Sequence, residues 1–224
     1  MIDIVLPVHN AGEYFWNCVQ SVRQFTDSYR LILVDDFSEE ETAEKVRLIA
    51  RQHQNSILIR TAKQRWFTRA VNLGLRMART PRVVILNSDC ELSIGWFEEL
   101  QAIWAECEGI GMKVGLVGSV MSDEEPRRYA ISNKPDYVTA HCLYVDMHAL
   151  TEVSVARGTP GIYLDETKQQ DIHIRSDVSI SWALNELGYA TIKSFKSRVG
   201  HHGGKSWGYN LAAIASVSLQ DVND

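Results

Sequence analysis

Residues 82–91 read RVVILNSDCE, and within this stretch an aliphatic run gives way abruptly to polar residues. Residues 83–86 have the length and the branched side chains of a strand that is buried on both faces. Asn87, Ser88 and Asp89 follow it directly. Burying a carboxylate is costly unless it is paired or binds a metal. A strand that delivers Asp89 at its end therefore indicates a ligand there.

Strand-like and helix-like segments alternate through the first half of the chain. Short apolar runs occupy residues 2–7, 31–34, 56–59 and 83–86. Apolar residues recur at helical spacing in residues 12–26, 42–49, 67–78 and 97–107. Ser38-Glu39-Glu40-Glu41 fits a capping box that opens the second helix. Such βα repeats predict an α/β fold, with a mostly parallel central sheet and helices on both faces.

The second half continues with more strands and one further helix. Residues 113–145 read as strands, and residues 177–188 read as a helix that ends at Gly188, a residue type common just past a helix end. Because no repeat, low-complexity segment or linker divides the 224 residues, a single domain over residues 1–224 is expected.

Composition excludes several classes of protein. The net charge is −5 without a basic run, which argues against a nucleic-acid partner. The four cysteines form no C-x-x-C pair, so neither a zinc site nor a disulfide framework is indicated. No apolar stretch approaches the about 20 residues of a membrane-spanning helix. The start, MIDIVLPVHN, lacks the features of a signal peptide, and a cytoplasmic location is expected.

Polar residues follow three of the predicted strands. His9-Asn10 follows the first, Asp35-Asp36 the second and Asn87-Ser88-Asp89 the fourth. Ligands of open α/β sheets bind beyond the carboxyl ends of the strands, so these groups are expected to share one rim. Loops and caps are the alternative, since Asp and Asn are common in turns. A cap at Ser38 would leave Asp36 free for a ligand.

The sequence lacks the glycine-rich loops that bind phosphates in other α/β folds. Neither G-x-G-x-x-G nor G-x-x-x-x-G-K-[ST] is present. Without such a loop, a diphosphate needs a cation to neutralise it. A carboxylate at a strand end suits Mg²⁺ or Mn²⁺, and Asp89 is the best candidate for holding it.

Several separated segments together resemble one enzyme family. They are IDIVLPVHNAGEYFWNCVQSV, LILVDDFSEEET, FTRAVNLGL, VVILNSDCELSIGWFEEL, YLDE, DVSISWALNELGY and VGHHGGKSW. Their order and spacing resemble the inverting glycosyltransferase family 2, over roughly residues 2–207. The resemblance implies a single domain of GT-A type, with a nucleotide-binding half (residues 1–107) and an acceptor and catalytic half (residues 108–210). It also implies transfer of a hexosyl or related sugar.

The resemblance also assigns roles to residues that bind the donor. Pro7 and His9 match the loop that lines the nucleoside, and Asp36 matches the residue that hydrogen-bonds the base. Asn87-Ser88-Asp89 stands at the D-x-D motif, with Asp89 as its metal-binding acid. Arg65, Asn87, Ser88 and Lys205 are further candidates for binding the nucleotide.

Two roles fall in the second half of the chain. Asp177 matches the general base that deprotonates the acceptor hydroxyl, and His201 matches a histidine that reaches the metal. Asp177 also suits the cap of a helix that begins near Val178, a role that is compatible with that of a base. His201 and His202 also suit a packing or surface role. Trp66 and Trp207 are either core residues or platforms for a sugar or base.

The resemblance implies cofactors and partners as well. Mn²⁺ or Mg²⁺ is the expected metal, and a UDP- or dTDP-linked sugar the expected donor. The acceptor is a glycan, a lipid-linked sugar or a protein side chain; a nucleic acid is not expected, and contact with a membrane surface stays open.

The sequence departs from the family at three positions: Asn87 replaces the first acid of D-x-D, Ser176 stands where Glu is frequent and Trp66 stands where Gly is common. A weakly active or non-catalytic nucleotide-sugar-binding relative therefore remains an alternative. A sugar-phosphate nucleotidyltransferase is a further one, although its G-x-G-T-R-like stretch is absent.

Overall fold

A computed structural model describes residues 1–120, 126–134, 136–166 and 174–202. Its strands are β1 (Ile2–Val8), β2 (Tyr29–Asp35), β3 (Ser56–Arg60), β4 (Arg82–Leu86), β5 (Cys90–Leu92), β6 (Val114–Ser119), β7 (Tyr129–Ser132), β8 (Cys142–Asp146), β9 (Ala190–Ser194) and β10 (Val199–His201). Its helices are α1 (Gly12–Phe25), α2 (Glu40–Gln52), α3 (Trp66–Leu75), α4 (Trp96–Gly109), α5 (Met147–Ala156) and α6 (Ile174–Glu186). None of these helices is both long and apolar enough to cross a membrane.

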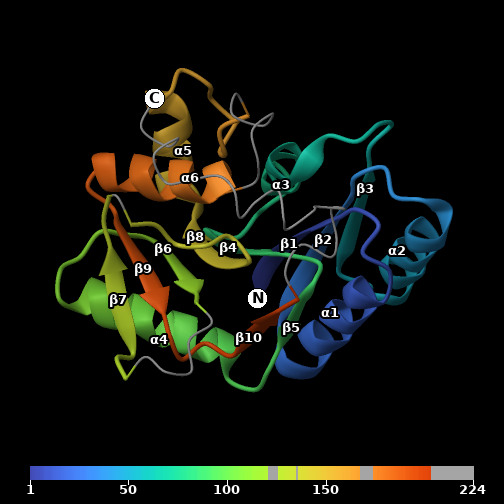
Figure 1. The fold of residues 1–224 in the computed structure, drawn as a ribbon, viewed down its shortest axis with the longest axis horizontal. Helices are drawn as coiled ribbons and strands as arrows, with labels where there is room; N and C mark the ends of the chain where they lie inside the picture. Colours follow the sequence, from blue (N-terminus) through green and yellow to red (C-terminus); the bar gives the residue numbers. More distant parts are fainter. Residues whose placement is uncertain (121–125, 135, 167–173, 203–224) are drawn as a thin grey trace, which may run out of the picture.

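One large sheet runs through the middle of the molecule. Its eight strands follow the order β3-β2-β1-β4-β8-β6-β9-β7 (Figure 1). The strands β3, β2, β1 and β4 are parallel, whereas β8 runs antiparallel to both of its neighbours. The predicted α/β class with a mainly parallel sheet is confirmed. Because β1, β2 and β4 are adjacent and parallel, their carboxyl ends meet at one rim.

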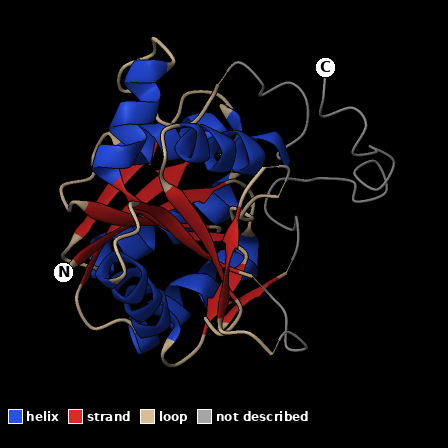
Figure 2. Cartoon of the chain, turned by 90° about the vertical axis from the view of Figure 1, so that its left-hand side faces the viewer, coloured by secondary structure: helices blue, strands red, loops and turns tan. Residues whose placement is uncertain are grey.

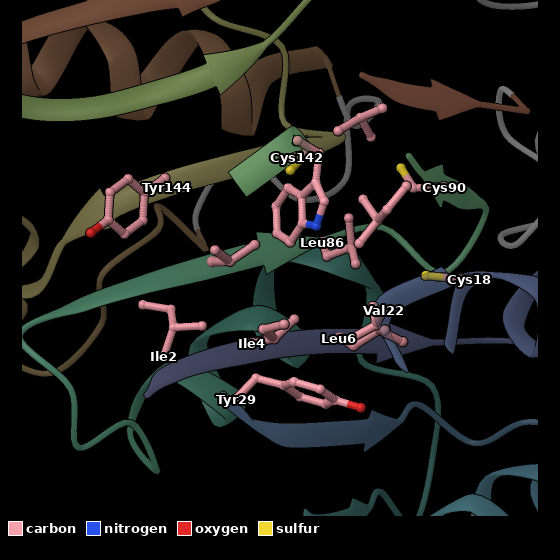
Figure 3. Close-up of a cluster of buried hydrophobic side chains, with 14 of the residues drawn as sticks. Ile2, Ile4, Leu6, Cys18, Val22, Tyr29, Leu86, Cys90, Cys142 and Tyr144 are labelled. Carbon is pink, nitrogen blue, oxygen red and sulfur yellow. The ribbon is translucent and has the colours of Figure 1, made fainter. Parts of the chain in front are cut away.

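Helices cover both faces of this sheet, as Figure 2 shows. Successive side chains of a strand point to opposite faces, so Ile4 and Leu6 join the cluster packed by α1, α2 and α4. Figure 3 shows these side chains together with Cys18 of α1. Val5 joins the other cluster, which α3, α5 and α6 cover. Gly74 lets α3 approach closely, because a Cβ there would lie 2.4 Å from Cγ1 of Val5.

Three local features differ from the sequence prediction. The capping box is wrong: α2 begins at Glu40, its N-cap is Glu39 without a side-chain bond, and Ser38 Oγ instead accepts from the Asn10 N–H at 3.1 Å. Helix α5 was not predicted. Helix α6 begins at Ile174 rather than near Val178, so Asp177 lies within its first turn and is not its cap.

Candidate active site

Hydrogen bonds join the ends of β1 and β2 at the rim. The Asp36 N–H donates to the Val8 carbonyl at 2.8 Å, and His9 Nδ1 donates to the Asp36 carbonyl at 2.7 Å. Since a carbonyl only accepts, the second bond places a proton on Nδ1 of His9. Pro7 is buried one position before Val8. The two segments that are expected to line the nucleoside, residues 7–9 and the segment around Asp36, therefore lie side by side.

Asp36 is not free, contrary to the expectation that a cap at Ser38 would release it. Its Oδ1 accepts from Thr61 Oγ1 at 3.0 Å and from the Arg65 N–H at 2.8 Å. Its Oδ2 accepts from the N–H groups of Arg65 at 2.9 Å and Trp66 at 2.7 Å. Burial raises the pKa of this carboxyl, although these bonds oppose the shift. A base that reaches Asp36 must displace one of these donors.

Asp89 and His201 meet at the end of β4. Nε2 of His201 lies 3.2 Å from Oδ1 of Asp89, and the amide nitrogen of Asn87 lies 3.5 Å from the same Nε2. Strand β10 positions His201, because it pairs antiparallel with β5 and sets His201 opposite Cys90. His202 is directed elsewhere, with Nε2 3.2 Å from Oε1 of Glu91.

The residues around Asp89 fit a divalent cation. The side-chain oxygens Oδ1 of Asn87 and Oγ of Ser88 are buried without a hydrogen-bond partner, and such oxygens are ligands that Mg²⁺ and Mn²⁺ accept. Ligand atoms of Asp89, Cys90 and His201 all lie within 4.8 Å of one another. Cys90 was not predicted as a ligand. Its position directly after Asp89 is the one feature of the sequence that could have indicated it. Its thiol donates to the His141 carbonyl at 3.2 Å.

His141 connects the parts of this site, and the sequence analysis missed it. Its carbonyl also accepts from the Asn87 N–H at 2.9 Å. Its ring stacks on that of His201, with centroids 5.2 Å apart and planes at 14°. Burial lowers the pKa of His141 to about 4, so the ring is neutral at pH 7. A single histidine in a stretch of strands carries no pattern that would have revealed this position.

Asp177 also contacts the segment of residues 140–141. Its Oδ2 accepts from the Ala140 N–H at 2.7 Å, and Ser176 Oγ donates to its Oδ1 at 3.3 Å. Burial raises the pKa of Asp177 to about 7, although both hydrogen bonds and the nearby His201 oppose the shift. A carboxyl that titrates near neutrality is suited to accept a proton.

The remaining candidates are distributed differently. Arg65 is exposed at the start of α3, where its N–H binds Asp36. Lys205 lies outside the described residues, as do Gly203, Gly204 and Trp207. Two groups therefore emerge: one around Asp36 and the ends of β1 and β2, and one around Asp89, His201 and Asp177.

Known proteins share this fold and parts of this sequence. AglE, a glycosyltransferase of Haloferax volcanii, is 24% identical over an alignment of 199 residues that covers 84% of this chain and 62% of AglE. GlyG, a glycosyltransferase of Streptococcus pneumoniae, is 27% identical over 90 residues, or 40% of this chain and 30% of GlyG. The chain thus spans less than two thirds of either relative.

Solved structures show the same fold. The mannosyltransferase PcManGT of Pyrobaculum calidifontis, in complex with GDP-Man and Mn²⁺, superposes with a TM-score of 0.67 at 16% identity, covering 88% of this chain and 55% of that one. GalNAc-T7 with UDP, GalNAc and Mn²⁺ also gives 0.67 at 16% identity, covering 90% and 43%. The family profile described as Glycosyl transferase family 2 matches residues 3–151, well over half of the chain. With that match and the GT-A fold, the chain belongs to glycosyl transferase family 2.

Proposed function

We propose that this protein transfers a sugar from a nucleoside diphosphate sugar to an acceptor hydroxyl, with inversion at the anomeric carbon. One observation supports this most directly: residues 140–141 join Asp177 to the Asp89–His201 pair, through the Ala140 N–H and the stacked ring of His141. The proposed proton acceptor and the proposed cation-binding pair thus both contact one short segment. A displacement reaction needs a base for the acceptor hydroxyl and a positive charge at the leaving group within reach of one sugar.

Asp177 acts as the general base. Its carboxylate takes the proton of the acceptor hydroxyl while the oxygen forms a bond to the anomeric carbon. The bond from that carbon to the diphosphate oxygen breaks, and the nucleoside diphosphate leaves with the electron pair. The bond from the Ala140 N–H holds the carboxylate in place, and Oδ1 remains next to the Ser176 hydroxyl.

Asp89 and His201 hold a divalent cation, with Mn²⁺ or Mg²⁺ as the candidates. Such a cation, when bound, supplies positive charge next to the leaving diphosphate. The structures of PcManGT and GalNAc-T7 both contain Mn²⁺ with a nucleotide or nucleotide sugar, which supports the assignment. Asn87 brings no charge where an acid would, so Asp89 is the sole acid of this motif.

The nucleotide lies along the rim from Asp89 toward the end of β2. His9, Pro7 and the segment around Asp36 line its nucleoside, and Arg65 adds positive charge at the same rim. From sequence, Lys205 is a further contact for the diphosphate. A UDP- or dTDP-linked sugar is the proposed donor, and a glycan, a lipid-linked sugar or a protein side chain the acceptor.

The test is a panel of nucleoside diphosphate sugars with Mn²⁺. Donor binding is measured by thermal shift, and release of the nucleoside diphosphate by a coupled assay, for the wild type and Asp177→Asn. The proposal expects binding by both proteins and release by the wild type alone. Binding without release by either protein would identify a non-catalytic binder. Release of pyrophosphate from a nucleoside triphosphate and a sugar phosphate would identify a nucleotidyltransferase.

A further inference from the structure

His141 is the residue on which the two chain segments of the proposed cation site converge. Its carbonyl accepts from the Asn87 N–H at 2.9 Å and from the Cys90 thiol at 3.2 Å, so it contacts both ends of the turn that carries Asp89. Its ring stacks on that of His201, with centroids 5.2 Å apart. One residue therefore contacts the segment of the proposed acid ligand through its main chain and the proposed histidine ligand through its side chain.

The main chain next to His141 is fixed on the face of α6. The Ala140 N–H donates to Asp177 Oδ2 at 2.7 Å, and the Val138 N–H donates to Ser181 Oγ at 3.1 Å. The two acceptors are four positions apart in the helix, so they lie on one face of it. Because its carbonyl is also bonded to the turn that follows β4, the ring of His141 is carried by a backbone that is hydrogen-bonded on both sides.

His201, in contrast, belongs to a very small sheet. Strand β10 has three residues, and within the described chain it pairs only with β5, which also has three (Figure 1). A two-stranded sheet is marginally stable by itself. The edge of the His201 ring contacts Asp89, with Nε2 3.2 Å from Oδ1, but both atoms would become ligands of a bound cation. The face that stacks on His141 is not needed for the cation, so that contact is available in both states.

The ring of His141 is itself held in place. The residue is 7% exposed, and its Nδ1 lies 3.1 Å from Thr139 Oγ1. Its Nε2 is buried and has no hydrogen-bond partner among the described residues. A buried nitrogen without a partner is destabilising. The stacked face, rather than this second nitrogen, is therefore the part of the ring that the site uses.

We propose that His141 is a positioning residue, whose ring holds His201 in the orientation that binds the cation. This inference rests on the proposed function. Among the described residues, the ligand atoms that converge at the site come from Asp89, Cys90 and His201, so His141 acts through His201 and not as a ligand. Loss of its ring should weaken binding of the cation and reduce the preference for Mn²⁺ over Mg²⁺ that imidazole provides.

Titration calorimetry of UDP with Mn²⁺ or Mg²⁺ tests this inference on the full chain. His141→Leu keeps an apolar side chain but removes the flat face, and His141→Phe restores a flat face. His201→Ala, alone and combined with His141→Leu, completes a double-mutant cycle. His53→Ala is the matched control. The ring of His53 also stacks on an aromatic ring, that of Tyr29 at 4.8 Å, and its Nε2 is also buried without a partner. Tyr29, however, begins β2, so this pair lies at the end of the sheet opposite the rim.

His141→Leu is expected to raise the Kd for UDP with Mn²⁺ about 10-fold to 100-fold and to reduce the preference for Mn²⁺, as His201→Ala does. The double variant should bind no more weakly than His201→Ala alone, because the ring acts only through His201. His141→Phe should retain most of the affinity. In the metal-free protein, the ring-proton NMR signals of His201 should shift in His141→Leu and not in His53→Ala, a change that a general loss of stability would not produce.

Three results would overturn the positioning role and leave the proposed cation site intact. One is a wild-type Kd in His141→Leu next to a defect in His201→Ala, and another is an unchanged set of His201 NMR signals in His141→Leu. The third is a loss that adds fully in the double variant, or a defect in His141→Phe as large as in His141→Leu, since either would mean that His141 contacts the ligand directly. Equal binding of UDP by the wild type with and without a cation would refute the proposed cation site itself, and this inference with it.

Discussion

The backbone N–H of Ala140 lies 2.7 Å from Oδ2 of Asp177, and the next residue in the chain stacks its ring on His201. The segment of residues 140–141 therefore fixes the position of the proposed base relative to the proposed cation site. This relationship involves a main-chain group, so it does not depend on the side chain of Ala140. Mutations can therefore test the proposed base and the proposed cation site separately.

We expect Asp177→Asn to abolish transfer and to preserve donor binding. The amide oxygen still accepts from the Ala140 N–H, so the segment stays in place, whereas the base is gone. Removal of a general base costs about 10²–10⁴ in rate. Single-turnover transfer together with calorimetry of the nucleoside diphosphate measures both effects. Near-normal turnover in this variant would limit Asp177 to a structural role.

The rate of the wild type should follow the ionisation of Asp177. Burial raises its pKa to about 7, so the carboxylate is the minor form below neutrality. We expect kcat/KM to rise by about tenfold per pH unit up to this pKa and then to level off. A flat pH profile between roughly 5 and 7 would contradict the assignment of Asp177 as the base, because the ionised fraction of a carboxyl with a pKa of about 7 rises throughout this range.

The stability of the metal-free protein should change in the opposite direction. The pKa of Asp177 is higher in the folded protein, about 7, than its ordinary value of 3.8. The folded state thus binds this proton more tightly than the unfolded chain. Its free energy of unfolding should fall as pH rises from 3.8 to about 7. Urea unfolding across this range should show a shallower decline for Asp177→Asn.

Asp89 and His201 should differ in their effect on the metal. Asp89→Ala removes the charged ligand, and we expect it to abolish Mn²⁺-dependent nucleotide binding. His201→Ala should weaken binding and reduce the preference for Mn²⁺ over Mg²⁺, because imidazole suits Mn²⁺ better. Calorimetry with each metal measures this. His202→Ala is the control, since His202 faces Glu91; a metal defect in that variant alone would reverse the two roles.

Asp36→Ala should weaken nucleotide binding through the segment it holds. The change leaves the N–H groups of Arg65 and Trp66 without their acceptor, at a cost of about 1–3 kcal/mol for a buried group. We expect a lower melting temperature and a higher Kd for UDP. Asp36→Asn keeps one acceptor oxygen, so it should lose less of both. A higher Kd for UDP with an unchanged melting temperature would mean that Asp36 contacts the nucleotide directly rather than through the segment it holds.

The sheet could be predicted because its signal is local. Each strand from β1 to β4 is a short aliphatic run, and each following helix shows its own periodicity. The pairing of β5 with β10 could not be predicted, because each has three residues and their partners are far apart in the chain. Helix α5 was missed for a related reason: it follows β8 without a break, and Asp146 belongs to the strand as well as capping the helix.

The site could be predicted in part. The approach of polar strand ends follows from parallel strands, and the family resemblance proposed roles for Asp89 and His201, which the structure brings together, and for Asp177. The occupation of Asp36 could not be foreseen, since its donors are backbone N–H groups at Arg65 and Trp66 that no side-chain pattern reveals. The capping role predicted for Ser38 was wrong because its hydroxyl accepts from the N–H of the distant Asn10 instead of capping α2.

The short sheet of β5 and β10 also has a consequence for biosynthesis. Asn87 and His201 are 114 positions apart, yet they meet in one site. A nascent chain forms β1 to β4 long before β10 leaves the ribosome, and until then β5 has an open edge. The proposed cation site is thus complete only when nearly all of the described chain has been made. Affinity for the cation would then be a measure of complete folding, and a chain that ends before β10 would lack the proposed site.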